Sequence, residues 1–196
     1  MRSLAEQHEF NLRRWAELLA DPKLAAMPNK IETDRDGKII VNPPVDGDHG
    51  DRQAEIGSQL TGSRPKGRAI IECGVSTSEG TKVPDVAWLS SKHPEVLKAF
   101  LAAKPAPEIC IEILSPDDTA KEIREKTALY FEAGAREVWI CDLQGKMRFL
   151  SPTGDLSAST LFPEFPKVIY TYPERLALEG EEGRRANVRE NAASGT

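Results

Sequence analysis

Cysteine is scarce in this 196-residue sequence, and its placement excludes the common uses of that residue. The chain has three cysteines, Cys73, Cys110 and Cys141, and each lies in an apolar stretch far from the others. With only three histidines besides, no spacing typical of a zinc site is present, and an odd number of cysteines does not make a disulfide framework. We therefore interpret the cysteines as small core residues in a reducing compartment, and we expect a cytoplasmic protein.

Long apolar runs are also missing, which argues against a membrane protein. No stretch approaches the roughly 20 apolar residues that cross a bilayer, and the first ten residues lack the continuous apolar core of a signal peptide. An excess of positive charge is missing too, because the formal net charge is -5. That value argues against a protein that coats nucleic acid, although a local patch can act within an acidic whole.

The periodicity of the apolar residues predicts an α/β (α+β) fold with a mixed central β-sheet flanked by helices. A strand, a helix and a strand follow one another over residues 109–143, which indicates a crossover unit. Two capping boxes, Ser3 with Glu6 and Thr119 with Glu122, mark helix starts. The expected helices cover residues 4–20, 48–60, 96–103 and 119–134, and the expected strands cover 31–41 (a hairpin), 69–75, 81–89, 109–114, 137–143 and 147–150.

Two acidic residues interrupt the apolar strands. Glu112 lies in the middle of the run from 109 to 114, and Asp85 lies within the run from 83 to 89. An ionised carboxylate in an interior strand is costly unless a hydrogen-bonded partner or a metal compensates for its lost hydration. If the two strands are neighbours in register, both carboxylates can point the same way, and a divalent cation between them would relieve their repulsion. Oxygen-only ligation favours Mg²⁺, with Mn²⁺ as an alternative.

Lys126 strengthens this interpretation. On the helix that follows the strand of Glu112, Ile123, Lys126, Thr127 and Tyr130 form the stripe that should face the sheet. An ammonium group there needs an anionic partner, and it could reach back to the carboxylates and hold a phosphate oxygen or a water molecule. The alternative is that Lys126 extends to the edge of the helix and pairs with Glu122.

The order of these motifs resembles a known family. The segments VPDVAW, EILSP and EK...Y...GA.EVWICD, preceded by GKIIVNPP, RQAEIGSQL and GVSTSEGTKVPD, are similar to the Uma-two family of restriction endonucleases, a branch of the PD-(D/E)XK nuclease superfamily. The resemblance covers roughly residues 30 to 150. It implies a restriction-endonuclease-like domain over residues 30–178, after an N-terminal helical segment (1–29) and before a tail (179–196) that we expect to be disordered.

The resemblance also assigns roles to single residues. Asp85 is the acid of the Pro-Asp pair, Glu112 is the second acid, and Glu55 is the helical acid that precedes the sheet in many members. All three would hold the metal. The sequence departs from the superfamily pattern at Leu114, where lysine would stand two residues after the acid, and the resemblance suggests that Lys126 supplies this charge from the helix.

For the other candidate site residues, a structural explanation stands beside the functional one. His49 stands near the start of the helix of Glu55, where similar proteins often have histidine, but a cap or a surface role explains it equally well. Glu55 flanks the apolar face of its helix, so a solvated acid is an even alternative. Trp88 and Trp139 lie in strands and are expected in the core rather than as platforms for bases.

These observations predict a Mg²⁺-dependent endonuclease that cleaves DNA, with a homodimer as an option and no membrane partner. An alternative from another class is a binding or interaction module that keeps the nuclease fold without cleaving, favoured by the net negative charge and by the missing lysine at Leu114. A third interpretation is structural, with Asp85 and Glu112 paired to Arg or Lys in internal salt bridges.

Overall fold

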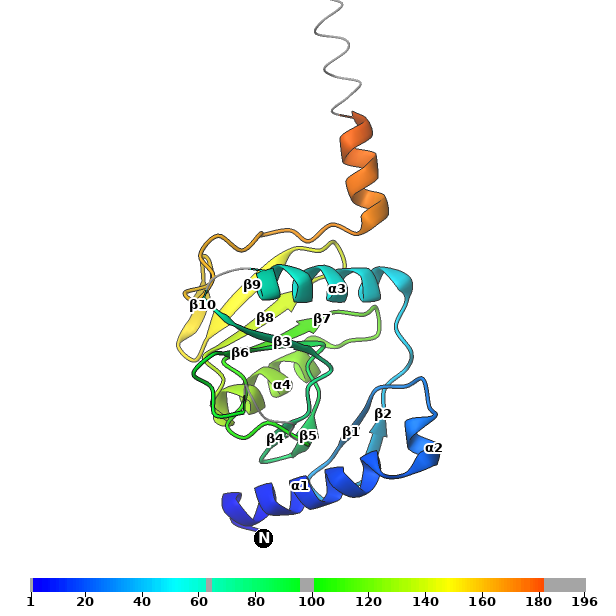
Figure 1. Cartoon of the computed structure of the whole chain (residues 1–196), viewed down its shortest axis with the longest axis vertical. Helices are drawn as coiled ribbons and strands as arrows, with labels where there is room; N and C mark the ends of the chain where they lie inside the picture. Colours follow the sequence, from blue (N-terminus) through cyan, green and yellow to red (C-terminus); the bar gives the residue numbers. More distant parts are fainter. Residues whose placement is uncertain (1, 63–64, 96–100, 182–196) are drawn as a thin grey trace, which may run out of the picture.

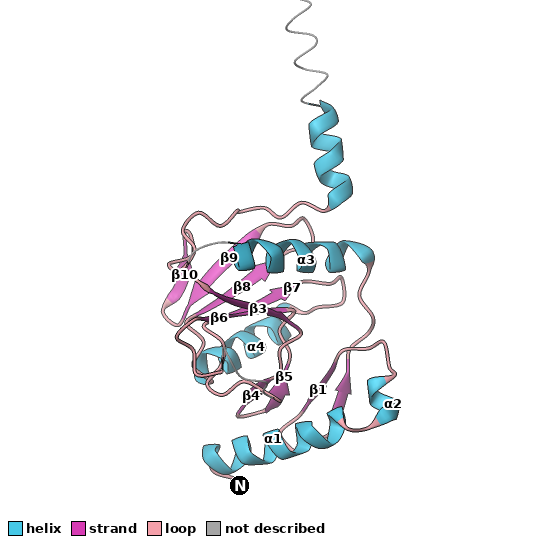
Figure 2. Ribbon diagram, viewed as in Figure 1, coloured by secondary structure: helices cyan, strands magenta, loops and turns pink. Residues whose placement is uncertain are grey.

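A six-stranded mixed sheet organises the computed structural model, which describes residues 2–62, 65–95 and 101–181 (Figures 1 and 2). The strand order is β10-β9-β8-β7-β6-β3. Its strands are β3 (Gly67–Ile71), β6 (Val86–Ser90), β7 (Ile109–Ile113), β8 (Glu137–Cys141), β9 (Met147–Ser151) and β10 (Gly154–Leu156). The remaining elements are α1 (Leu4–Leu19), α2 (Pro22–Ala25), β1 (Ile31–Thr33), β2 (Ile39–Val41), α3 (Gly47–Gly62), β4 (Val75–Thr77), β5 (Gly80–Lys82) and α4 (Ala120–Glu132).

The expected crossover unit is present and confirms the mixed sheet. β7 and β8 pair in parallel, with α4 between them along the chain, whereas β6 pairs antiparallel with both β3 and β7. Both expected capping boxes form, at Ser3 with Glu6 and at Thr119 with Glu122. Because each box satisfies free N–H groups in a first helical turn, it fixes where α1 and α4 begin.

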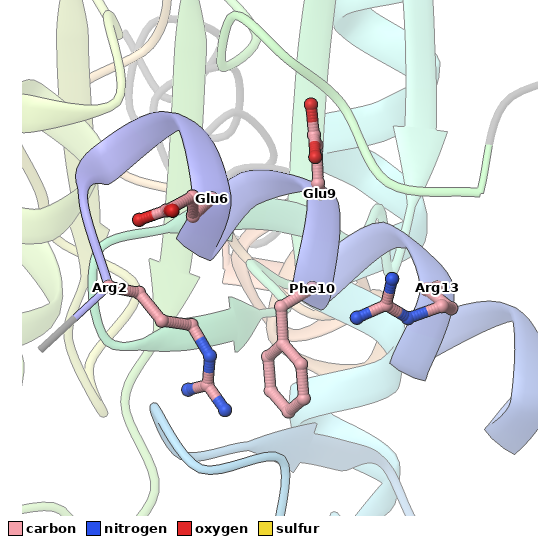
Figure 3. A pocket seen from close by; sticks show the side chains of 5 residues that line it. All are labelled: Arg2, Glu6, Glu9, Phe10 and Arg13. Atoms are coloured by element: carbon pink, nitrogen blue, oxygen red, sulfur yellow. The ribbon is translucent and has the colours of Figure 1, made fainter.

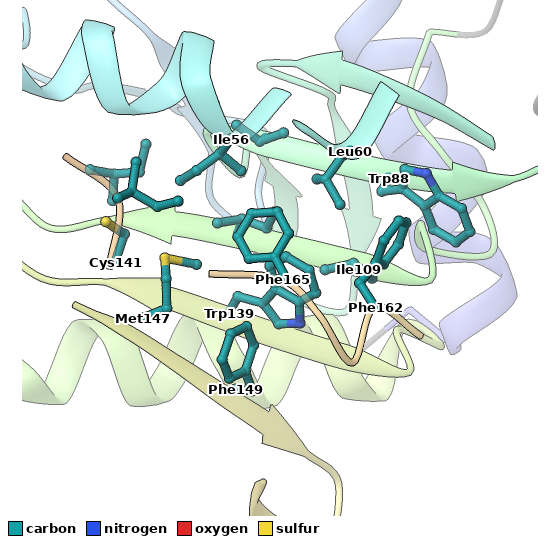
Figure 4. Close-up of a cluster of buried hydrophobic side chains, with 14 residues drawn as sticks. Ile56, Leu60, Trp88, Ile109, Trp139, Cys141, Met147, Phe149, Phe162 and Phe165 are labelled. Carbon is teal, nitrogen blue, oxygen red and sulfur yellow. The ribbon is translucent and has the colours of Figure 1, made fainter. Parts of the chain in front are cut away.

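The two faces of the sheet carry different apolar clusters. On one face, Ile56 and Leu60 of α3 pack over Trp88 and Trp139, which are fully buried, and phenylalanines from the C-terminal part of the chain complete the cluster (Figure 4). On the other face, Tyr130 of α4 packs in a second cluster with alternate residues of β7 and β8. Alternation along β7 therefore directs its isoleucines to the α3 face and Cys110 and Glu112 to the α4 face, as the sequence predicts.

The N-terminal part of the chain forms a small layer of its own. α1 lies across the β4–β5 hairpin, and the β1–β2 hairpin stands beside them (Figure 1). Along the chain, the Pro43-Pro44 segment lies between β2 and α3. The tight turn of β1–β2 uses Gly37, whose φ of 79° is accessible to glycine, as the Asp36-Gly37 signal predicts. Buried Asn11 ties α1 to the β4–β5 turn by donating to the carbonyl groups of Thr77 and Gly80.

Some expected elements differ from the structure. The expected strands 69–75 and 81–89 are each divided, into β3 and β4 and into β5 and β6, because Glu72 adopts a positive φ of 51° and Pro84 interrupts the second run. Of the expected helix 96–103, residues 96–100 lie outside the described residues, and Ala103 forms a bridge to Val75 instead of a helical turn.

Three further expectations concern the chain ends, the cysteines and the membrane. A helix over residues 172–181 follows the sheet and extends away from it (Figure 2). It includes residues 179–181, which we expected in the disordered tail, and the rest of that tail lies outside the described residues. All three cysteines are free and buried, which confirms them as core residues. In the described ranges we find no helix with the length and apolar character that a membrane crossing requires.

Candidate active site

Asp85 and Glu112 face each other across the β6–β7 pair. The antiparallel register aligns Val86 with Ile111, so the next residues outward, Asp85 and Glu112, are opposite one another on the same face. The backbone N–H of Ile113 donates to Oδ2 of Asp85 at 2.7 Å, which fixes the carboxylate against the end of β7. Both acids are buried, with 2% of Asp85 and 4% of Glu112 exposed.

Asp85 is held in its ionised form by cations and donors from three segments. Nζ of Lys30, just before β1, lies 2.6 Å from Oδ1, and Nε2 of His49 on α3 lies 3.4 Å from Oδ2. Gln53, one turn further along α3, donates to the backbone carbonyl of Asp85 at 2.9 Å. Burial acts to raise the pKa of Asp85, but the hydrogen bond from His49 and the charge of Lys30 outweigh it and lower the pKa to about 2.

Glu112 is paired with two side chains of α4. The hydroxyl of Tyr130 donates to Oε1 at 2.6 Å, and Nζ of Lys126 lies 3.1 Å from Oε2. Burial raises the pKa of Glu112, and repulsion from Asp85 adds to this effect against the attraction of Lys126. Of the pair Asp85 and Glu112, Glu112 is therefore the one that takes up a proton more readily.

Lys126 connects Glu112 to a third acid that the sequence did not single out. Its Nζ also lies 3.0 Å from Oε1 of Glu32 in β1, and the same oxygen accepts from the backbone N–H of Val83 at 3.0 Å. Burial acts to lower the pKa of Lys126, but Glu112 and Glu32 raise it well above its usual range. Lys126 is thus a permanent cation, and it does not extend to Glu122 as the alternative proposed.

Glu55 does not join this group. It lies further along α3, where Arg175 donates to it at 2.9 Å and Gln59 at 2.7 Å. On α3 the residues that contact Asp85 are His49 and Gln53, one turn apart, and Glu55 lies about half a turn around the helix from Gln53. The structure therefore gives no support to Glu55 as a metal ligand. Glu55 corresponds instead to the alternative from the sequence, a partly exposed acid.

Sequence reasoning missed or undervalued several members of the group. Lys30 lies just before the short strand β1 and Glu32 lies within it, and only a charged residue in a β-prone hairpin could have indicated them. For His49 the sequence left a cap or surface role as an equal alternative, but only 7% of the residue is exposed, so it is buried. The side chain that accepts from a backbone N–H at the start of α3 belongs to Asp46. Lys82 is also buried, with 9% exposed, and donates to the backbone carbonyl of Thr33 at 3.0 Å.

These charged groups form one wall of a cavity of about 1130 Å³ between the N-terminal layer and the main sheet. Residues from β1, β2, α3, β5, the end of β7 and α4 line it. A second, shallow depression lies on α1 and holds Arg2, Glu6, Glu9, Phe10 and Arg13, where the Arg2 guanidinium stacks over the Phe10 ring at 3.8 Å (Figure 3). The larger cavity, which contains both strand acids, is the candidate active site.

The donors in this cavity fit a Mg²⁺ ion. In the described ranges no group of three or more His, Cys, Asp and Glu side chains is arranged to hold a metal by side chains alone. Mg²⁺ commonly keeps several waters and needs only one or two carboxylates, which Asp85, just before β6, and Glu112, in the neighbouring β7, offer. Lys30 and Lys126 now bind oxygens of these carboxylates, so an entering cation competes with two ammonium groups.

Comparison with known proteins gives a family and a fold. Residues 15–153 match the model of the Uma2 family, described as a putative restriction endonuclease. Among solved structures, a putative nuclease belonging to DUF820 from Anabaena variabilis is similar, with a TM-score of 0.55 and 24% sequence identity over 70% of this chain and 79% of that chain. No curated protein matches. The solved structure confirms the expected nuclease-type fold, and the family model confirms the resemblance drawn from the motifs.

Proposed function

Because the chain belongs to the Uma2 family, we propose that it is a metal-dependent endonuclease that hydrolyses phosphodiester bonds of DNA. One observation carries the proposal. Two buried carboxylates, Asp85 just before β6 and Glu112 in the neighbouring strand β7, face each other, and Lys126 on α4 lies 3.1 Å from Glu112. Acids and a lysine in this arrangement suit the hydrolysis of a phosphate ester.

Asp85 and Glu112 would hold the metal, which when bound supplies Lewis acidity and lowers the pKa of a bound water. The residues around them keep these carboxylates aligned. Gln53 and the backbone of Ile113 fix Asp85, and Tyr130 fixes Glu112. Since these donors are already in place, little reorganisation is needed when substrate enters.

Lys126 would stabilise negative charge on the phosphate. Its pKa lies well above its usual range, so it stays an ammonium group at every pH of interest and acts as a hydrogen-bond donor rather than a base. If the ammonium group of Lys126 leaves Glu112 or Glu32 and binds a phosphate oxygen, it exchanges one anionic partner for another, so its charge stays compensated.

Cleavage of supercoiled and linear DNA tests the proposal, with Mg²⁺, Mn²⁺ or EDTA present. We expect activity only with a divalent ion, and a loss of about 100-fold or more in Asp85→Asn, Glu112→Gln and Lys126→Met. Asp155→Asn, an exposed acid in β10 outside the cavity lining, is the control and should retain activity. Activity in EDTA, or full activity in the three variants, contradicts the proposal.

A non-cleaving module with the same fold is the second candidate, and one observation favours it. Lys30 and Lys126 already neutralise the two strand acids, as internal salt bridges would. Calorimetric titration separates the two functions, because a module without catalysis has no requirement for an ion at Asp85 and Glu112. Saturable binding of Mn²⁺ that is lost in Asp85→Asn supports the endonuclease, and absence of binding supports the module.

A further inference from the structure

The charges of the main cavity are arranged in two layers. Its cationic residues are buried or half-buried: Lys30, Arg52, Lys82 and Lys126. Its exposed charged residues are all acidic: Asp46, Asp48, Glu79, Asp117, Asp118, Glu122, Glu125 and Glu132. A phosphate that approaches from solvent therefore passes an anionic rim before it reaches the cations.

This rim opposes a duplex more strongly than a single strand. Duplex DNA carries one negative charge per about 1.7 Å of axis, whereas one strand carries one per about 3.4 Å. Proteins that bind a duplex along its backbone normally offer exposed lysine and arginine to the phosphates. Among the described residues that line this cavity, no exposed side chain carries a positive charge.

Apolar side chains from two parts of the chain line the same cavity. Ile40, at 39% exposed, and Val45, at 48%, belong to β2 and the segment after it, together with Pro43 and Pro44. The second part contributes Leu114, Pro116, Leu129 and Leu143, which follow β7 along the chain. Nucleotide-processing enzymes hold an unstacked base between aromatic or apolar side chains, and a paired base cannot present its faces in this way.

One lysine in the cavity has no acidic partner of its own. In the described ranges Lys30 and Lys126 both form ion pairs, but Lys82 forms none and donates only to the carbonyl of Thr33 at 3.0 Å. Burial lowers the pKa of Lys82, and an anion beside it would act in the opposite direction by favouring the ammonium form. A phosphate next to Lys82 would therefore be stabilised without displacing an existing ion pair.

We propose that the cavity accepts an unpaired nucleotide of single-stranded DNA, with its base between the apolar walls of Ile40 and Leu114 and a phosphate on Lys82. This inference rests on the proposed endonuclease function and specifies its substrate. The acidic rim rejects the paired duplex, the apolar walls hold the base, and Lys82 anchors the backbone next to Asp85 and Glu112.

Cleavage and binding together test the inference. One oligonucleotide is supplied as a single strand, as a full duplex and as a duplex with a central unpaired bubble. We expect kcat/KM to be at least tenfold higher for the single strand and the bubble than for the duplex. Fluorescence anisotropy with Ca²⁺ in place of Mg²⁺ measures binding of the same three oligonucleotides, and the same order of affinity is expected.

Two matched pairs of variants report on the walls and on the lysine. Ile40→Asp should weaken single-strand binding about tenfold, whereas Ile39→Asp, on the same strand but outside the cavity lining, should not. Lys82→Met should weaken it similarly, with Lys38→Met, exposed and outside the lining, as control. Asp117→Asn combined with Glu125→Gln should raise duplex binding by lowering the repulsion at the rim.

The outcomes separate this inference from the function on which it rests. Duplex cleaved or bound at least as well as the single strand overturns the inference and leaves the endonuclease intact. Equal effects within either matched pair also overturn it. If no DNA form is cleaved, the endonuclease function fails, and the anisotropy measurements still decide whether the cavity selects an unpaired strand.

Discussion

Nζ of Lys126 lies 3.1 Å from Oε2 of Glu112, so the positive charge beside this acid comes from α4 and not from position 114, two residues after the acid along the chain. The strand position, Leu114, instead packs against the apolar cluster beneath α4. Lys126 reaches Glu112 because the inner stripe of α4 faces the strand that precedes it along the chain. The positive charge beside Glu112 is thus supplied by α4, the helix that follows β7 along the chain.

Replacement of Lys126 separates its charge from the packing of α4. Lys126→Met keeps the length of the side chain, and we expect a 100- to 1000-fold loss of DNA cleavage, about the effect of removing one donor to transition-state charge. Lys121→Met, on the exposed face of the same helix, should change cleavage less than twofold. Circular dichroism should show equal helicity in both variants, and comparable losses of activity in the two would contradict the role of Lys126.

Removal of Lys30 should strengthen metal binding. Its Nζ lies 2.6 Å from Oδ1 of Asp85, where it competes with an entering cation. In Lys30→Met we expect the affinity for Mn²⁺ to rise about tenfold, equivalent to ~1.4 kcal/mol, in calorimetric titrations. Lys38→Met, an exposed lysine of the same hairpin, serves as control. Unchanged or weaker binding in Lys30→Met would show that no competition occurs.

Asp85 should make stability depend on acid pH. Its pKa is about 2 in the folded protein, below the usual value of 3.8, so the folded state keeps the charged form to lower pH than the unfolded state does. The stabilisation is therefore complete above about pH 5 and is lost as the pH falls towards 2, a change of about 2 kcal/mol.

Urea unfolding at pH 7, 5, 4 and 3 measures this dependence. Asp85→Asn should be less stable than the wild type at pH 7, and the difference should shrink towards pH 3. Asp155→Asn, an exposed acid in β10, should follow the wild-type profile. A constant difference between Asp85→Asn and the wild type across this range would exclude the predicted linkage.

Loss of the Tyr130 hydroxyl should destabilise the fold. This hydroxyl donates to Oε1 of Glu112 at 2.6 Å in a fully buried setting. We expect Tyr130→Phe to lower the free energy of unfolding by about 2 kcal/mol, typical of a hydrogen bond to a buried charged group. Tyr172→Phe, where 59% of the residue is exposed, should change it by less than about 0.5 kcal/mol. Equal effects in the two variants would contradict a stabilising role for the hydrogen bond of the Tyr130 hydroxyl.

The main sheet and the central acids could be predicted from local patterns. The run around Glu112 alternates with period two, and the stripe of α4 has helical period, so the two elements and their facing sides follow from short-range rules. The Asp36-Gly37 turn and both capping boxes have similarly local causes. Asp85 and Glu112 were found because a charge in an apolar strand is conspicuous.

The partners of these acids could not be predicted, because their positions depend on tertiary packing. Lys30 and Glu32 lie in a hairpin whose own pattern does not indicate that it approaches the main sheet. Lys82 resembles any lysine near the end of a strand until the structure shows it buried. Glu55 illustrates the opposite case, because its position along α3 turns it to Arg175.

The layer that carries Lys30 and Glu32 also affects when the site can exist during biosynthesis. Lys30 and Asp85 are 55 residues apart, and Glu32 meets Lys126 only after α4 has been made. Contacts of such sequence separation form late, since the chain must first close long loops. A ribosome-bound fragment that ends before α4 therefore contains Asp85 and Glu112 without Lys126, and the complete set of charges is present only once α4 has been added.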